Sequence, residues 1–182
     1  MSHCNSAKRI VTESDEQMGI GVFPKAETEL KLIFLHPGGL YASREAAKLS
    51  IILGSCVAVC MYNPRLKIGG ATHYLLPSLR GAAGPNSPRY GDFAIEQLLD
   101  QLMKVGSQKT ELLAHIYGGA SVLDSFRAST EESIGSKNVR LAHDMLREES
   151  VPIVKLEAGG EKGRKISMRT DTGEITCKTI GG

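Results

Sequence analysis

Hydrophobic side chains along this chain follow two different periods. Between residues 90 and 106 large aliphatic side chains recur at helical spacing, and Gly106 supplies the stop. A second helix is predicted from Asn138, as its cap, to about Glu148. Short apolar runs bounded by glycine, proline or asparagine predict strands instead, and these runs cover about residues 30–35, 57–62, 69–76, 112–117 and 151–156.

The C-terminal region has the clearest alternation. Every second residue from Ile166 to Thr170, and again from Ile175 to Thr179, is suited to one face of a strand. Residues 171–174 between them have the composition of a tight turn, so a hairpin is predicted. Strands mixed with two helices predict a single α+β domain of mixed β-sheets, over residues 30–182.

The strand pattern also brings a thiol and an imidazole into one hairpin. Cys56 follows a glycine-serine pair suited to a tight turn and precedes the apolar run 57–62, while His73 lies on the next run. The turn signal at residues 63–65 would fold the second run back toward Cys56. A thiol activated by an imidazole attacks amide carbonyls, and free N–H groups in the turn would stabilise the oxygen anion that forms.

Simpler interpretations of these residues remain open at this point. An unpaired cysteine is most often a small buried hydrophobe, and a histidine is most often a packing or surface residue. Cys56 and Cys60 share a strand face, which would also allow a redox pair. His73 with the two cysteines gives three metal ligands at an unfamiliar spacing, so no metal site is predicted.

Composition limits the class of protein without defining its chemistry. The 182 residues carry a formal net charge of only +2, which favours neither a nucleic-acid-binding nor a membrane-surface protein. The four cysteines include no Cys-x-x-Cys pair, and no apolar run is long enough to cross a membrane. Residues 1–29 are polar, mixed in charge and without a hydrophobic signal core, so we expect a flexible N-terminal extension and a cytoplasmic protein.

Several separated motifs, taken in order, resemble one known family. The stretches 52–59, 68–70 and 73–77, which read ILGSCVAV, IGG and HYLLP, are similar to the signature of CheD, the chemoreceptor glutamine deamidase. Four further pieces occur in the same order as in that family: RYGD at 89–92, GGA at 118–120, IG at 134–135 with Asn138, and GG at 159–160 followed by GRK at 163–165. The resemblance extends over about residues 30–180.

The resemblance implies a fold, an activity and roles for three residues. It implies layered sheets covered by helices, as in other cysteine hydrolases, and a protein-glutamine glutaminase that needs no cofactor. Cys56 matches the family's nucleophile and His73 its general base and acid. Ser50 stands where the family usually has a threonine that orients the histidine, and Thr72 stands where asparagine is common. Serine keeps the hydroxyl and the backbone carbonyl of that position.

Two functional hypotheses follow from the resemblance. In the first, the chain deamidates exposed glutamines in the cytoplasmic domains of chemoreceptors. In the second, it is a non-catalytic chemotaxis module that binds a CheC-type phosphatase or receptors. Hydrolysis of some other amide by the same thiol is a minor alternative. Mass spectrometry of a receptor fragment treated with the wild type and with Cys56→Ala distinguishes the first two.

Overall fold

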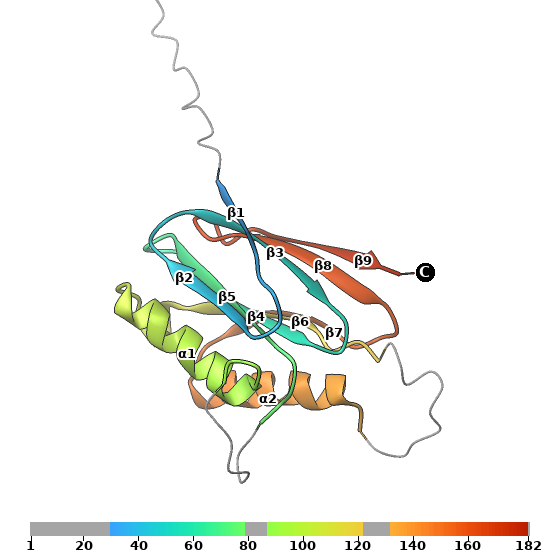
Figure 1. The fold of residues 1–182 in the computed structure, drawn as a ribbon. Helices are drawn as coiled ribbons and strands as arrows, with labels where there is room; N and C mark the ends of the chain where they lie inside the picture. Colours follow the sequence, from blue (N-terminus) through green and yellow to red (C-terminus); the bar gives the residue numbers. More distant parts are fainter. Residues whose placement is uncertain (1–29, 79–86, 122–131, 182) are drawn as a thin grey trace, which may run out of the picture.

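The computed structural model describes residues 30–78, 87–121 and 132–181, and it consists of three layers (Figure 1). An outer sheet has the order β1 (Lys31–Phe34), β3 (Ala47–Leu53), β8 (Gly163–Arg169), β9 (Ile175–Ile180). A central sheet has the order β2 (Gly39–Ser43), β5 (Ile68–Tyr74), β4 (Val57–Asn63), β6 (Leu113–Gly118), β7 (Ile153–Ala158). Helices α1 (Gly91–Lys104) and α2 (Ile134–Glu148) form the third layer, and a short 3-10 helix, η1 (Lys109–Glu111), precedes β6. The α+β prediction is confirmed, whereas the predicted extension at 1–29 lies outside the described residues.

Alternate residues of the central sheet face two different cores, because successive side chains of a strand point to opposite sides. On β4, Val57, Val59 and Met61 face the helices, while Ala58 and Cys60 face the outer sheet. All five are fully buried. The continuous apolar run that predicted a strand therefore marks a strand covered on both faces.

Each helix contributes one apolar stripe to the core beneath it. On α1 the stripe consists of Ile95, Leu98, Leu99 and Leu102, each at most 2% exposed, and the chain leaves the helix at Gly106, where φ is +107°. This helix was predicted correctly. On α2 the prediction of the start was wrong: Ser133 is the cap, because its hydroxyl accepts the N–H of Ser136 at 3.0 Å, and Asn138 lies one turn inside the helix.

Both predicted hairpins are confirmed, whereas two strands were missed. Strands β4 and β5 pair in antiparallel fashion, as do β8 and β9. The missed strands, β2 and β3, are held by long-range pairing: β2 pairs with β5, and β3 lies between β1 and β8.

Both helices of the described residues pack on the central sheet, so within these ranges no helix covers the far face of the outer sheet (Figure 1). Leu32, Phe34 and Ile52 on this face are 52%, 61% and 62% exposed. The resemblance led us to expect sheets covered by helices, and this holds for one of the two sheets.

Candidate active site

Cys56 lies at the end of the turn that connects the two sheets. Strand β3 of the outer sheet ends at Leu53, and β4 of the central sheet begins at Val57. The side chain of Cys56 is partly exposed and packs against the core between the sheets. The thiol is therefore at the rim of the inter-sheet space, which is the edge position predicted from the sequence.

Three neighbouring backbone carbonyls of this turn are each held by a partner from another element. Ala120 N donates to Gly54 O at 2.8 Å, and Gly119 N donates to Cys56 O at 2.8 Å. Gly118 must be glycine here, because φ is +116° and a Cβ would lie 2.2 Å from Cys56 O. The GGA motif thus holds the turn by close backbone contact.

The third of these carbonyls is bound by a helix residue. Asn138 Nδ2 of α2 donates to Ser55 O at 3.1 Å and also to Leu75 O, just beyond β5, at 2.8 Å. Sequence analysis assigned Asn138 to a helix cap and so missed this contact. Its membership of the IG motif was the only available signal.

His73 is almost completely buried on β5, at 2% exposure. Its Nδ1 lies 3.0 Å from the backbone oxygen of Leu35. Because a carbonyl oxygen only accepts, Nδ1 carries the proton and Nε2 is left as the acceptor. Within the described part of the chain Nε2 has no hydrogen-bond partner, although it is buried.

The strand register places the two side chains on one face. His73 is the cross-strand partner of Ala58, and Cys56 lies two residues before Ala58 on the same side of the strand. Cys56 and His73 are thus diagonal neighbours, for which Cα atoms are about 7–8 Å apart and long side chains come into reach. The predicted hairpin is therefore present and places both side chains on one face, while their function as a catalytic pair stays a prediction.

Burial opposes charge on both groups. It raises the pKa of the Cys56 thiol, although the backbone N–H of the same residue counteracts part of the effect by hydrogen-bonding the thiolate. Burial also lowers the pKa of His73, more strongly than the Leu35 hydrogen bond raises it. A thiol activated by a nearby imidazole, as the sequence predicted here, would have a depressed pKa. That part of the prediction was wrong for Cys56, because the sequence pattern gave no measure of burial. Both shifts favour the neutral forms, a thiol on Cys56 and an imidazole on His73.

Ser50 lies on β3 and reaches His73 only through the backbone. Leu49 and Ile51 point into the core between the sheets, so the Ser50 side chain lies on the opposite face of the strand. Its carbonyl oxygen accepts the N–H of Leu35 at 3.0 Å, and Leu35 in turn presents its own carbonyl to His73. The sequence analysis did not predict the contact between Leu35 and His73. The turn predicted at residues 36–39 was the only local indication that the carbonyl of Leu35 could face another segment.

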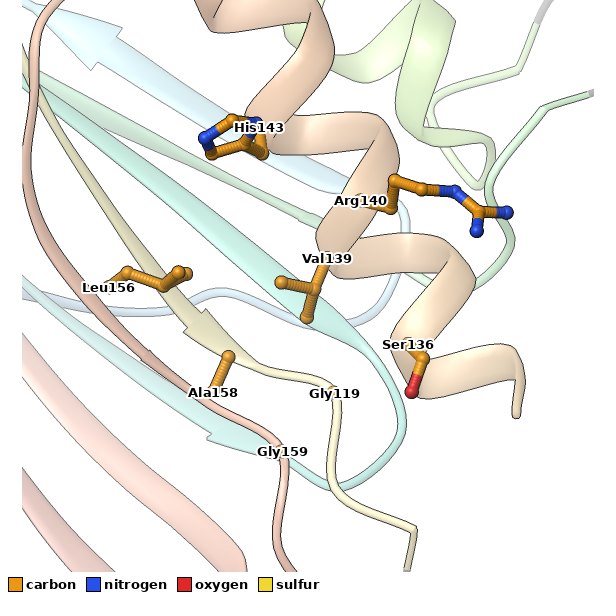
Figure 2. A pocket seen from close by; sticks show the side chains of 8 residues that line it. All are labelled: Gly119, Ser136, Val139, Arg140, His143, Leu156, Ala158 and Gly159. Atoms are coloured by element: carbon orange, nitrogen blue, oxygen red, sulfur yellow. The ribbon is translucent and has the colours of Figure 1, made fainter. Parts of the chain in front are cut away.

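A hollow of about 500 Å³ borders the turn on the helix side. Figure 2 shows Val139 of α2 and Leu156 of β7 directed toward each other across it, while the Arg140 side chain extends away. Gly119 belongs to the wall of the hollow and its N–H also donates to Cys56 O, so this one residue connects the hollow with the turn that carries the thiol.

The described ranges contain neither a metal-binding cluster nor a membrane-spanning helix. Among residues 30–78, 87–121 and 132–181, no three His, Cys, Asp or Glu side chains are grouped so that they would hold a metal ion. Over the same residues, no helix combines the length and apolar character that crossing a membrane requires.

Comparison with known proteins gives a consistent family assignment. A family model described as CheD chemotactic sensory transduction matches residues 75–179. A protein of Sulfurimonas denitrificans is 37% identical over 81% of this chain and 93% of its own length, and one of Trichlorobacter lovleyi is 38% identical over 80% and 89%. A protein of Rhodospirillum rubrum is 38% identical over 81% of both chains. Each of the three is named a probable chemoreceptor glutamine deamidase CheD.

The family model covers Leu75 and Asn138 but begins after Cys56 and His73. The alignments to the relatives are longer and cover about four fifths of the chain. A crystal structure of the Neisseria meningitidis protein NMB0706 aligns with a TM-score of 0.40 at 11% identity, over 72% of this chain and 63% of that one. On the sequence comparisons, this chain belongs to the CheD family.

Proposed function

We propose that this protein hydrolyses the side-chain carboxamide of selected glutamines in chemoreceptor cytoplasmic domains, giving glutamate and ammonia. The names of its relatives support the substrate and the reaction. The observation that carries the mechanism is the diagonal placement of Cys56 and His73 on one face, with His73 Nε2 left as an acceptor. A cytoplasmic location follows from such a substrate.

The first half of the reaction forms a covalent intermediate. As the thiol sulfur of Cys56 bonds to the carboxamide carbon, His73 Nε2 takes the thiol proton. The carbonyl oxygen becomes an anion, and N–H groups of the turn stabilise it. The C–N bond then breaks, and His73 returns the proton to the departing ammonia, which leaves a thioester on Cys56.

The second half regenerates the enzyme. His73 Nε2 takes a proton from water as the water oxygen attacks the thioester carbon. The C–S bond breaks, the sulfur recovers a proton from His73, and glutamate is released. One water is consumed and one ammonia is produced, without any oxidant or reductant.

Ser50 acts in this proposal through its main chain. Its carbonyl fixes the Leu35 amide, and the Leu35 carbonyl fixes the tautomer and the ring orientation of His73. This connection through Leu35 explains how the residue at position 50, usually threonine in the family, could orient the histidine without a direct side-chain contact. Ser50 is thus a positioning residue, whereas Cys56 and His73 contact the reacting atoms.

The test is the mass of receptor glutamines after incubation. A chemoreceptor cytoplasmic fragment is treated with wild type, Cys56→Ala, His73→Gln and Cys60→Ala, and its peptides are analysed by mass spectrometry. Wild type and Cys60→Ala are expected to add about 1 Da at specific glutamines, because an NH2 group is replaced by OH, and the other two are expected to add nothing. Cys60 is the matched control, since it lies on the same strand face but is fully buried.

The competing hypothesis of a binding module has its own outcome in this experiment. If wild type leaves every glutamine unchanged while both wild type and Cys56→Ala bind the fragment equally, the proposal fails and the module is favoured. A CheC-type phosphatase as a second partner stays a prediction from the family resemblance.

A further inference from the structure

One amide side chain joins the two halves of the candidate site. Asn138 is fully buried, and its Nδ2 donates to Leu75 O at 2.8 Å and to Ser55 O at 3.1 Å. Leu75 follows His73 by two residues, and Ser55 immediately precedes Cys56. The strand that carries the imidazole and the turn that carries the thiol are therefore tied to one point on α2.

The bond to Ser55 O also sets the direction of a second group. The carbonyl of Ser55 and the N–H of Cys56 belong to the same planar peptide, in which C=O and N–H point in opposite directions. Holding the carbonyl against Asn138 consequently directs the Cys56 N–H away from α2. The same N–H belongs to the residue that carries the sulfur, and it lowers the pKa of that thiol against the larger effect of burial.

A backbone N–H in this place suits the charge that develops in amide hydrolysis. The carbonyl oxygen of an attacked carboxamide lies next to the attacking sulfur, and a preorganised N–H donor there stabilises the anion. A hydrogen bond accepted by the carbonyl of the same peptide strengthens the N–H as a donor. We propose that Asn138 is a positioning residue that holds the Ser55–Cys56 peptide so that the Cys56 N–H faces the thiolate and then the substrate oxygen.

The chemistry of the side chain fits this assignment. Two acceptors, Ser55 O and Leu75 O, demand two donors from one short group, and the NH2 of asparagine provides both. The other end, Oδ1, is buried and has no partner within the described ranges, so the amide is retained there for its donors. Tyr74 Oη donates to the backbone oxygen of Asn138 at 2.7 Å and fixes this turn of the helix above the site.

The inference rests on the proposed function, and its test separates a positioning effect from a loss of stability. Asn138→Leu keeps the approximate volume but removes both donors. Leu146→Ala is the matched control, because Leu146 is fully buried on the same helix and does not belong to the site. For each variant we would measure the melting temperature, kcat and KM on a receptor fragment, and the pH dependence of Cys56 alkylation by iodoacetamide.

We expect Asn138→Leu to lower kcat by about 10- to 100-fold with KM within about threefold, since the lost support acts on the transition state. We also expect its alkylation profile to move to higher pH, because the thiolate loses part of its N–H support. Leu146→Ala should lower the melting temperature while keeping the alkylation profile and kcat. If Asn138→Leu resembles Leu146→Ala in kcat and in the alkylation profile, the inference is overturned.

A milder variant keeps the test decisive if Asn138→Leu does not fold. Tyr74→Phe removes only the hydroxyl that holds the Asn138 backbone, so a smaller change in the same direction is expected. An unchanged alkylation profile and kcat in this variant would then count against the inference. Failure of the wild type to deamidate, with the alkylation shift still present in the variants, would refute the proposed function and leave the positioning effect standing.

Discussion

The Nδ1 atom of His73 lies 3.0 Å from the carbonyl oxygen of Leu35, and this contact determines which ring nitrogen is available for proton transfer. Leu35 follows β1 of the outer sheet, while His73 lies on β5 of the central sheet. The imidazole therefore belongs to a strand of the central sheet and hydrogen-bonds a backbone carbonyl next to the outer sheet. Its acceptor nitrogen, Nε2, is on the ring edge opposite the contact.

The first prediction concerns the pH dependence of activity. The pKa of His73 is lowered from 6.5 by burial, and the base must be unprotonated to act. As pH falls, His73 therefore becomes protonated only at a pH below 6.5, so the acid limb of kcat/KM should lie below that value. Initial rates of ammonia release between about pH 5 and 9 give the profile. An acid limb clearly above 6.5 would indicate that a different group, or a preformed ion pair, controls the reaction.

The second prediction concerns the reactivity of the cysteines. Burial raises the pKa of Cys60 to about 12, and burial together with Glu157 raises that of the partly exposed Cys177 to about 11. Cys56 is also partly exposed, and its own N–H lowers its pKa against the effect of burial. Iodoacetamide should label Cys56 before Cys60 and Cys177, with a rate that still increases above neutral pH because its pKa is raised rather than lowered. Peptide mapping over a time course measures this order. Equal labelling of all three in the folded protein would contradict an accessible, supported thiol.

The third prediction concerns Ser50. Its side chain lies on the strand face opposite His73, and only its backbone enters the contact with Leu35. Ser50→Ala should therefore keep kcat within about threefold of wild type. Steady-state kinetics on a receptor fragment checks this, with His73→Gln as the inactive reference. A loss of kcat as large as that of His73→Gln would assign a direct function to the hydroxyl.

The fourth prediction concerns the contact between α2 and the loop that holds Cys56. A Cβ on Gly135 would lie 2.4 Å from the backbone oxygen of Gly119, which has little room to move because its N–H is bonded to Cys56 O. Gly135→Ala should destabilise the protein by about 1–3 kcal/mol, although alanine favours a helix by about 1 kcal/mol. Chemical denaturation measures the change. Ser136→Ala, at the next and exposed position, is the control and should remain close to wild type.

Local pattern was sufficient to predict that Cys56 and His73 share one face of a hairpin. Cys56 immediately precedes β4 and His73 lies on β5, and alternation within a hairpin determines which side chains share a face. The same reason explains the correct prediction of β8 and β9. For such elements, the interactions that define the structure lie within about 20 residues of sequence, where periodicity and turn residues are informative.

The supporting contacts could not be found in this way, because they join distant segments. Asn138 reaches Ser55 across 83 positions, and His73 reaches Leu35 across 38. Asparagine is a common helix cap, and for this reason Asn138 was predicted to begin the helix. In the structure Ser133 is the cap and Asn138 lies within the helix. The pKa of Cys56 depends on how much of the thiol the outer sheet covers, which no local pattern expresses.

On the side of the outer sheet away from the helices, Leu32 and Ile52 each have a lysine as a cross-strand neighbour, whereas Ile180 pairs with Gly163. Leu32 pairs with Lys48, and Ile52 pairs with Lys165, which in turn pairs with Lys178. If two molecules associated through this face, the lysine ammonium groups of one would approach those of the other. At low ionic strength this repulsion opposes association of the two molecules. Concentrated salt removes that barrier, because the screening length falls to about 3 Å at 1 M ionic strength. Storage and crystallisation conditions would then decide whether these molecules remain dispersed.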